Sequence, residues 1–146
     1  MLTIRGHHLF DLLSALATGQ SDHKTLGPVA QQIRAHPKTP IMVVIGVDDI
    51  CSPCQWWCGQ KGRCTRELTE HPEDNPSALV SDANALRALG LEPGDVLPAD
   101  EIFGRIKARV DKHVFAEDVC VACRLVDDCR KTYSSLIDGT VRALAS

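Results

Sequence analysis

The chain has 146 residues, of which 44% are hydrophobic and 24% charged, and its formal net charge is −3. This length suits one domain over residues 1–146, with enough apolar side chains to form a core without crosslinks. Without a long basic run, nucleic-acid binding is excluded. A membrane span and a signal peptide are excluded because no apolar segment has the required length and layout. We therefore expect a cytoplasmic protein.

The first third of the chain predicts two helices and one strand. Residues 7–19 place leucines at helical spacing and end in a glycine, which indicates a helix with a C-terminal stop. A second helix is expected from about Pro28 to Pro37. Residues 40–47, PIMVVIGV, are β-branched and apolar on both faces, which predicts a buried strand that leads directly into Asp48.

The remainder predicts mostly helix. Residues 65–81 are polar and contain two prolines, so a loop is expected, followed by a short helix with Ser81 as its cap and Gly90 as its stop. After the turn EPGD, residues 98–114 carry one apolar stripe, formed by Ile102, Phe103, Ile106 and Val110. The stretch from Glu117 onward is also helical by pattern. The fold class is therefore α+β: a helix-rich single domain with a small sheet of one to three strands.

All seven cysteines lie in two patches of the sequence. The first patch, ICSPCQWWCGQKGRC, contains Cys51, Cys54, Cys58 and Cys64, and the second, CVACRLVDDC, contains Cys120, Cys123 and Cys129. Cytoplasmic thiols stay reduced and seven is an odd number, so a disulfide framework is disfavoured. Two C-x-x-C pairs, each followed by a further cysteine, indicate a thiolate metal or cluster site rather than seven unrelated buried thiols.

The C-x-x-C pairs supply the first candidate ligands, because each pair directs two sulfurs at one centre. We expect the two cysteine-bearing segments to meet at one site made by Cys51, Cys54, Cys120 and Cys123. Zn²⁺ and a [4Fe–4S] cluster both accept four cysteines, so these residues leave the metal open. The other three thiols could replace a ligand, hold a second site or be spare. In an unbroken helix Cys129 would point roughly opposite Cys120.

A second unusual group is the segment RGHH at residues 5–8. His7 and His8, just ahead of an amphipathic helix, could ligate a metal, move protons or bind an anion together with Arg5. The structural alternative is that one ring packs on the core and the other is solvated. Asp48 and Asp49 at the end of the predicted strand could cap a turn or form hydrogen bonds with these histidines.

RGHH, DDICSPC after a buried strand, LGLEPGD, and a late C-x-x-C followed by one more cysteine together resemble the bacterial and archaeal family labelled domain of unknown function 1284. The similarity covers nearly the whole chain and implies iron–sulfur binding with an unestablished activity. The positions that match the family pattern are Arg5, Gly6, His7, His8, Asp48, Asp49, Cys51, Cys54, Cys64, Cys120, Cys123 and Cys129. Cys58 is an addition, and Asp11 stands where many members have a cysteine.

Three functions remain open at this point. The first is a cytoplasmic protein that binds one [4Fe–4S] cluster, acts in electron transfer or as an accessory redox protein, and has a redox partner protein. The second is a zinc-stabilised interaction module. The third is a cluster-dependent enzyme in which His7 or His8 handles protons. The sequence leaves both enzymatic activity and oligomeric state open.

Overall fold

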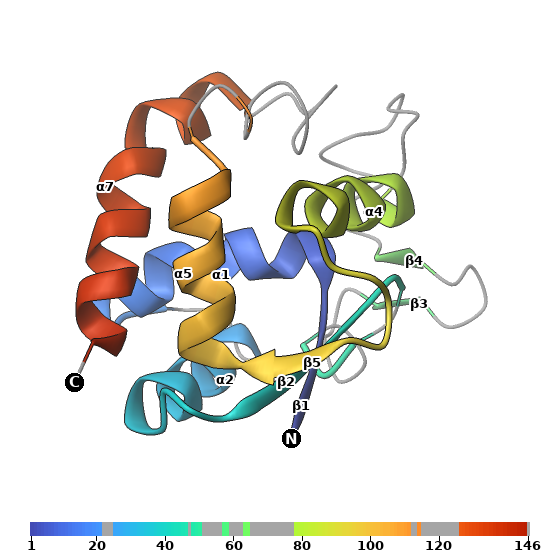
Figure 1. The fold of residues 1–146 in the computed structure, drawn as a ribbon, viewed down its shortest axis with the longest axis horizontal. Helices are drawn as coiled ribbons and strands as arrows, with labels where there is room; N and C mark the ends of the chain where they lie inside the picture. Colours follow the sequence, from blue (N-terminus) through green and yellow to red (C-terminus); the bar gives the residue numbers. More distant parts are fainter. Residues whose placement is uncertain are drawn as a thin grey trace.

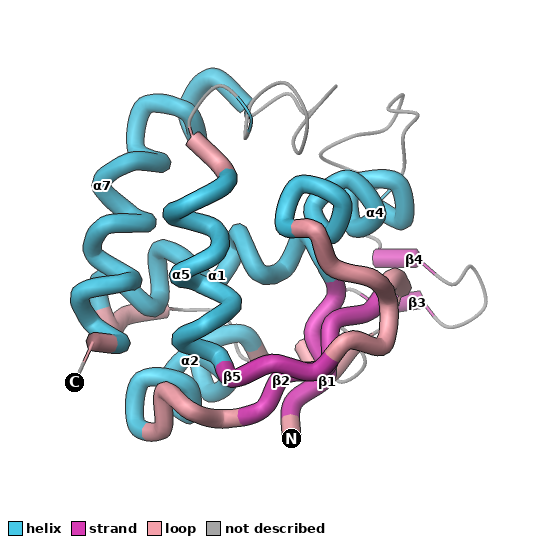
Figure 2. The backbone as a smooth tube through the Cα atoms, viewed as in Figure 1, coloured by secondary structure: helices cyan, strands magenta, loops and turns pink. Residues whose placement is uncertain are grey.

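A computed structural model describes residues 1–21, 25–46, 48–50, 57–58, 63–64, 78–111, 114 and 126–145, with the backbone alone described at 57–58, 63–64, 78–79 and 126–131. Over these residues the chain is rich in helix and has a small sheet, which confirms the predicted α+β class (Figures 1 and 2).

The main sheet has three strands in the order β1–β2–β5, with β2 in the middle. Strand β1 (Leu2–Arg5) runs parallel to β2 (Pro40–Val44), and β5 (Val96–Pro98) runs antiparallel to it. Two short strands, β3 (Trp57–Cys58) and β4 (Arg63–Cys64), form a separate antiparallel pair. Only β2 was predicted, because the other strands have two to four residues and are too short to show an alternating pattern.

The described part of the chain contains five helices. They are α1 (Gly6–Thr18), α2 (Leu26–Ala35), α4 (Ala78–Leu89), α5 (Ala99–Arg109) and α7 (Val126–Leu144). Helix α1 crosses the middle of the molecule and packs against α7, α4, α2 and β1 (Figure 1). It ends as predicted at Gly19, whose φ of 76° is in the left-handed region that glycine adopts without strain.

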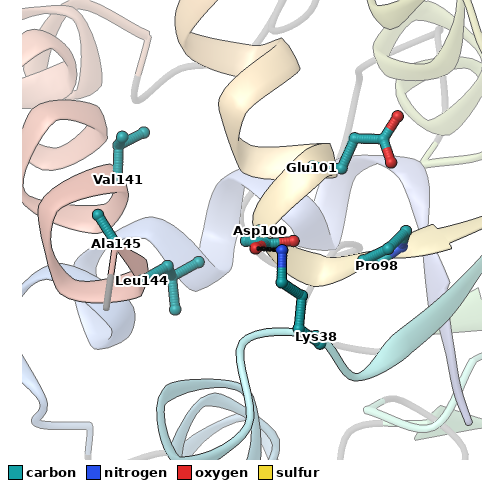
Figure 3. A pocket seen from close by; sticks show the side chains of 7 residues that line it. All are labelled: Lys38, Pro98, Asp100, Glu101, Val141, Leu144 and Ala145. Carbon is teal, nitrogen blue, oxygen red and sulfur yellow. Dashed lines mark ion pairs between the residues drawn. The ribbon is translucent and has the colours of Figure 1, made fainter.

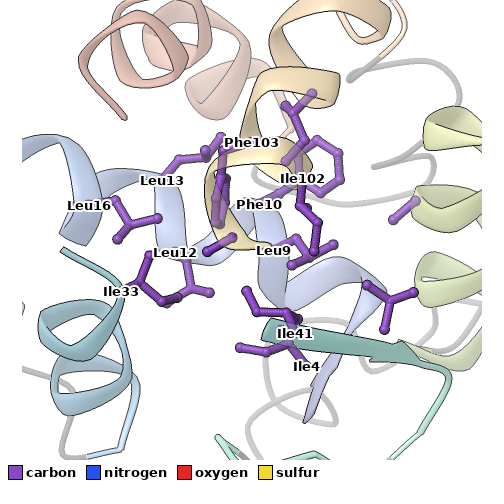
Figure 4. Packing of buried hydrophobic residues seen from close by; sticks show 14 of the residues in the cluster. Ile4, Leu9, Phe10, Leu12, Leu13, Leu16, Ile33, Ile41, Ile102 and Phe103 are labelled. Carbon is purple, nitrogen blue, oxygen red and sulfur yellow. The ribbon is translucent and has the colours of Figure 1, made fainter. Parts of the chain in front are cut away.

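Helix α1 supplies much of the hydrophobic core. Its leucines at positions 9, 12, 13 and 16 are buried, and Figure 4 shows them near Ile33 of α2, Ile41 of β2 and Phe103 of α5. The apolar stripe predicted around Phe103 is confirmed, since all four of its members are buried. Each such side chain contributes about 1.5–3 kcal/mol by its removal from water. This packing holds the first turn of α1 in a defined position.

Three predictions need correction or completion. Ser81 does not cap α4, because the helix begins at Ala78 and Ser81 lies inside it. Alanine and leucine, which are good helix formers, occupy positions 78 and 79, and residues farther along the helix pack in the core. The helix can therefore begin before Ser81. Strand β2 is buried mainly on one face, since Ile41 and Val43 are fully buried while Met42 is partly exposed. The helix expected in the C-terminal part of the chain is α7, and Cys129 of the second cysteine patch lies in its first turn.

A shallow cavity of about 430 Å³ lies where the start of α5 faces the end of α7 (Figure 3). Lys38 and Asp100 line it together with apolar side chains of α7, including Val141 and Leu144. This cavity is near the amino end of β2. The segment RGHH and Asp48 are at the opposite end of the sheet, after the carboxyl ends of β1 and β2. The lining of the cavity offers no histidine or cysteine among the described residues, so we do not regard it as the functional site.

Candidate functional site

The chain passes from β1 to α1 without a loop. Arg5 is the last residue of the strand, has extended backbone angles (φ −75°, ψ 153°), and gives α1 no side-chain cap. The first N–H groups of a helix have no partners within the helix and therefore require them from elsewhere. Here Asp82 of α4 accepts the N–H of His7 in the first turn, and Asp48, which follows β2, accepts the N–H of Arg5 immediately before the helix. The site is therefore built where α1 begins.

Asp82 is fully buried and accepts from four donors. Its Oδ1 faces Nδ1 of His7 at 2.6 Å and accepts the backbone N–H of His7 at 3.0 Å. Its Oδ2 accepts Nε–H of Arg5 at 2.8 Å and the backbone N–H of Gly46 at 3.0 Å. A carboxylate has about four acceptor positions, so this one is saturated. Asp82 thus joins α4, the end of β1, the start of α1 and the turn after β2.

Asp48 has the same role on the other side of the helix start. Its Oδ2 accepts the backbone N–H of Arg5 and faces Nδ1 of His8, both at 2.8 Å, and its Oδ1 accepts the backbone N–H of Ile50 at 2.9 Å. The neighbouring Asp49 accepts the backbone N–H of Thr3 at 2.8 Å. The expectation that this aspartate pair contacts the histidines is confirmed for Asp48 and His8.

Gly6 allows α4 to approach the start of α1 closely. A Cβ atom at this position would lie 2.3 Å from the backbone oxygen of Asp82 and 2.9 Å from its carbonyl carbon. Backbone atoms at such distances cannot move aside without shifting α4. Only glycine therefore fits between Arg5 and His7. Because α4 lies so close, the Asp82 carboxylate can contact both of these residues.

The two imidazole rings are held in a defined orientation. Their centroids are 4.5 Å apart with an interplanar angle of 61°, and the side chains of His7 and His8 are 25% and 14% exposed. An ionised carboxylate can only accept, so Nδ1 of each ring donates to its aspartate. The Nε2 atoms remain for other partners; that of His7 lies 3.9 Å from Oδ2 of Asp11.

The ionisation of His7 and Asp82 is coupled. Burial lowers the pKa of His7, but the hydrogen bond that the ring donates to Asp82 and the negative charge of Asp11 outweigh it, and the pKa is raised above its ordinary value. Burial would raise the pKa of Asp82, yet its hydrogen bond with His7 and the charges of His7 and Arg5 lower it overall. The pair therefore favours ionised Asp82 with protonated His7 when no other cation is present.

The structure brings His7 and His8 together with Asp48, as the sequence analysis expected. Among the predicted thiol ligands, the backbones of Cys64 and Cys129 lie in β4 and α7. The remaining four, Cys51, Cys54, Cys120 and Cys123, lie outside the described residues. The predicted meeting of the two patches, and the predicted nearness of the histidines to them, stay predictions.

Asp82 is the site residue that the sequence analysis missed. Its signal lies in the pattern of α4, where Ala85, Leu86 and Leu89 are buried and Asp82 precedes them by three, four and seven residues. Those spacings place a carboxylate on the apolar face of an amphipathic helix. A charge there requires a buried partner, which the structure shows to be Arg5.

Histidines that donate Nδ1–H to carboxylates are typical of metal and proton-transfer sites, because the carboxylate fixes both the tautomer and the ring orientation. Three carboxylates, those of Asp11, Asp48 and Asp82, surround the two rings together with the one guanidinium of Arg5. The group can therefore hold protons or a cation at the Nε2 atoms. No helix in the described part of the chain is long and apolar enough to cross a membrane.

A comparison with protein families finds one match. The model of the family described as Protein of unknown function (DUF1284) matches residues 23–129. The matched range includes both cysteine patches, Asp48 and Asp82, and it stops short of RGHH, although the resemblance was expected to cover nearly the whole chain. No curated protein and no solved structure gives a significant match.

Proposed function

The chain belongs to the family described as Protein of unknown function (DUF1284), and from this membership and its thiol pattern we propose that it binds one [4Fe–4S] cluster. Cysteines of both patches supply the ligands, and the protein acts in electron transfer or as an accessory redox protein with a redox partner protein. The observation that carries the proposal is the presence of two C-x-x-C pairs, each followed by a further cysteine, inside the family-matched range.

The donor set fits such a cluster. Thiolates are soft ligands that suit iron–sulfur clusters and Zn²⁺ and do not suit hard cations. A cluster of this type needs four thiolates, and the chain has seven cysteines. The ligands we favour are Cys51, Cys54, Cys120 and Cys123, with Cys64 and Cys129 as the next candidates. When bound, the cluster supplies a one-electron redox centre.

The described structure supports a link between the histidines and the first patch. Ile50 immediately precedes Cys51 and is buried. Its N–H donates to Oδ1 of Asp48 at 2.9 Å, and its carbonyl accepts Oγ1–H of Thr25 at 2.6 Å. Because the same Asp48 carboxylate faces His8, the chain enters the first patch from a point held beside the imidazoles. This supports His7 and His8 as residues that contribute to the surroundings of the cofactor.

Metal and sulfide analysis of protein purified without oxygen tests the proposal. We expect brown protein with about four iron atoms and four acid-labile sulfides per chain. Colourless protein that contains about one Zn²⁺ per chain and no sulfide would overturn the cluster and favour the zinc-stabilised interaction module. Protein prepared in the same way with added zinc alone is the control for metal scavenging.

A cluster-dependent enzyme is the second candidate, and the orientation of the imidazoles by buried carboxylates favours it. In such an enzyme His7 or His8 would exchange protons with a small substrate bound at an iron that has only three protein ligands. The electron paramagnetic resonance spectrum of the reduced cluster separates the two. An open iron changes this spectrum when cyanide or citrate is added, whereas a cluster with four cysteine ligands leaves it unchanged.

A further inference from the structure

Three metal-ligating side chains gather on one side of the first turns of α1. His7 and Asp11 are four residues apart and His8 and Asp11 are three apart, so each histidine has the aspartate as its neighbour on the helix surface. One ligand atom from each of the three lies within 4.8 Å of the others. None of these residues is a thiol, and the cluster proposed above does not require them as ligands.

We propose that His7, His8 and Asp11 form a separate site for a divalent transition-metal ion of the Mn²⁺, Fe²⁺, Co²⁺ or Zn²⁺ class. The ligands are Nε2 of each imidazole and one carboxylate oxygen of Asp11. Two imidazoles and one carboxylate are a donor set that binds these ions and leaves coordination positions open for water or substrate.

The second observation is the orientation of the rings. Each Nδ1 is already bonded to a buried carboxylate, His7 to Asp82 at 2.6 Å and His8 to Asp48 at 2.8 Å. Histidines that ligate metals commonly donate their other N–H in this way, which raises the basicity of the ligating nitrogen and fixes its direction. Both rings share this arrangement, which a purely structural role for one of them would not require.

The distances need only a small closure. Nε2 of His7 and Oδ2 of Asp11 are 3.9 Å apart. Ligand atoms that share a metal at bond lengths of about 2.1 Å stand about 3.0–3.5 Å apart. The Asp11 side chain is 55% exposed and therefore free to rotate, and one ligand atom from each of the three residues lies within 4.8 Å of the others. A cation would bind by drawing these three ligand atoms together, and Asp11 is the most exposed of the three residues.

Charge supports the same conclusion. Asp82 forms a 2.8 Å ion pair with Arg5, and the carboxylates of Asp48 and Asp11 also lie beside the rings. A divalent cation at the Nε2 atoms would compensate the negative charge of these carboxylates. Arg5 donates its Nε–H to Asp82, on the Nδ1 side of the His7 ring.

Co²⁺ titration of the full-length protein, as isolated without oxygen, tests the site. Co²⁺ bound by nitrogen and oxygen gives weak visible bands, whereas thiolate ligands add intense near-ultraviolet charge-transfer bands. We expect one Co²⁺ with the first spectrum, and an affinity that falls by at least about tenfold in Asp11→Ala and His8→Gln. The matched control is Asp138→Ala, because Asp138 is also on a helix surface and its side chain is 53% exposed. Its affinity should stay within about twofold of wild type.

Mn²⁺ and the wild-type protein provide a measurement that needs no variant. Mn²⁺ prefers nitrogen and oxygen ligands and broadens nuclear magnetic resonance signals close to it. Broadening centred on His7, His8 and Asp11 supports the site; broadening elsewhere, unchanged Co²⁺ affinity in Asp11→Ala, or thiolate bands alone would overturn it. The last outcome would leave the thiolate proposal intact. If the protein contains no iron and sulfide but gives the Co²⁺ spectrum of nitrogen and oxygen ligands, the site at His7, His8 and Asp11 is supported and the thiolate cluster is overturned.

Discussion

The two ends of the sheet contain ion pairs of nearly equal length in opposite surroundings. At the carboxyl end of β1, Arg5 and Asp82 are 2.8 Å apart and their side chains are 4% and 0% exposed. At the amino end of β2, Lys38 and Asp100 are 2.6 Å apart and their side chains are 83% and 24% exposed. The two ion pairs are therefore alike in length. They differ in burial and in the number of further hydrogen bonds that their carboxylates accept.

The comparison indicates why the first region is a functional candidate. Buried ion pairs are no better for stability than well-packed apolar groups, and removing one partner from such a pair is costly. An exposed ion pair contributes little to the free energy of unfolding, so its removal changes stability only slightly. A fold that keeps Arg5, Asp48 and Asp82 in its interior thereby orients two imidazoles, and we regard that orientation as the reason for the network.

The largest expected effect comes from Asp82→Asn. This change removes the negative charge of Asp82 beside the buried Arg5 guanidinium and places an amide group opposite donors. We expect the free energy of unfolding to fall by about 3–5 kcal/mol. Urea denaturation followed by circular dichroism measures it. A loss below about 1 kcal/mol would show that the buried network of Arg5 and Asp82 does not hold the start of α1 and its two imidazoles in place.

Gly6→Ala should have the next largest effect. The added methyl group meets the Asp82 backbone at 2.3 Å, so α4 must move away, and we expect a loss of about 1–3 kcal/mol. Gly104→Ala is the matched control, because Gly104 is also helical and a Cβ there meets no atom within 4 Å. It should stabilise the protein by about 0.5–1 kcal/mol, since alanine is the better helix former. Equal effects of the two changes would contradict the close approach.

The pH dependence of stability should reveal the His7–Asp82 pair in metal-free protein. Because the folded-state pKa of His7 is raised, its contribution is complete below about pH 6.5 and is lost as the pH rises through the raised value. For Asp82, whose pKa is lowered, the contribution is present above about pH 3.9 and is lost as the pH falls through the lowered value.

Urea denaturation with a chelator present, at a series of pH values, measures this dependence. Asp82, Asp11, Arg5 and His8 face His7, so the informative quantity is the difference between wild type and His7→Gln. The wild type should lose more stability than the variant between pH 6.5 and the raised pKa. Parallel curves across that range would contradict the coupling.

The smallest effect is expected at the exposed pair. Lys38→Met removes the ion pair with Asp100, and the free energy of unfolding should change by no more than about 0.5–1 kcal/mol. Added salt should weaken even that contribution, because exposed charges are screened. A loss comparable to that of Asp82→Asn would remove the distinction between the two ends of the sheet.

Much of this fold follows from sequence periodicity. The leucine spacing of α1, its stop at Gly19 and the stripe that includes Phe103 are local patterns, and the structure confirms them. β1 and β5 escaped prediction because their few residues gain strand geometry only by pairing with β2. Asp82 escaped because its partners are 77 and 75 residues away, at Arg5 and His7, and no local pattern records a contact of that range.

The central claim is that both cysteine patches supply one thiolate cluster site. Iron and sulfide content per chain, measured across the seven single cysteine-to-serine variants prepared without oxygen, tests it most directly. Serine at position 51, 54, 120 or 123 should abolish or severely reduce both contents, with Cys64 and Cys129 intermediate. At Cys58, which is additional to the family pattern, the effect should be mild. An essential Cys58 with dispensable Cys120 and Cys123 would place the site in the first patch alone and contradict the claim.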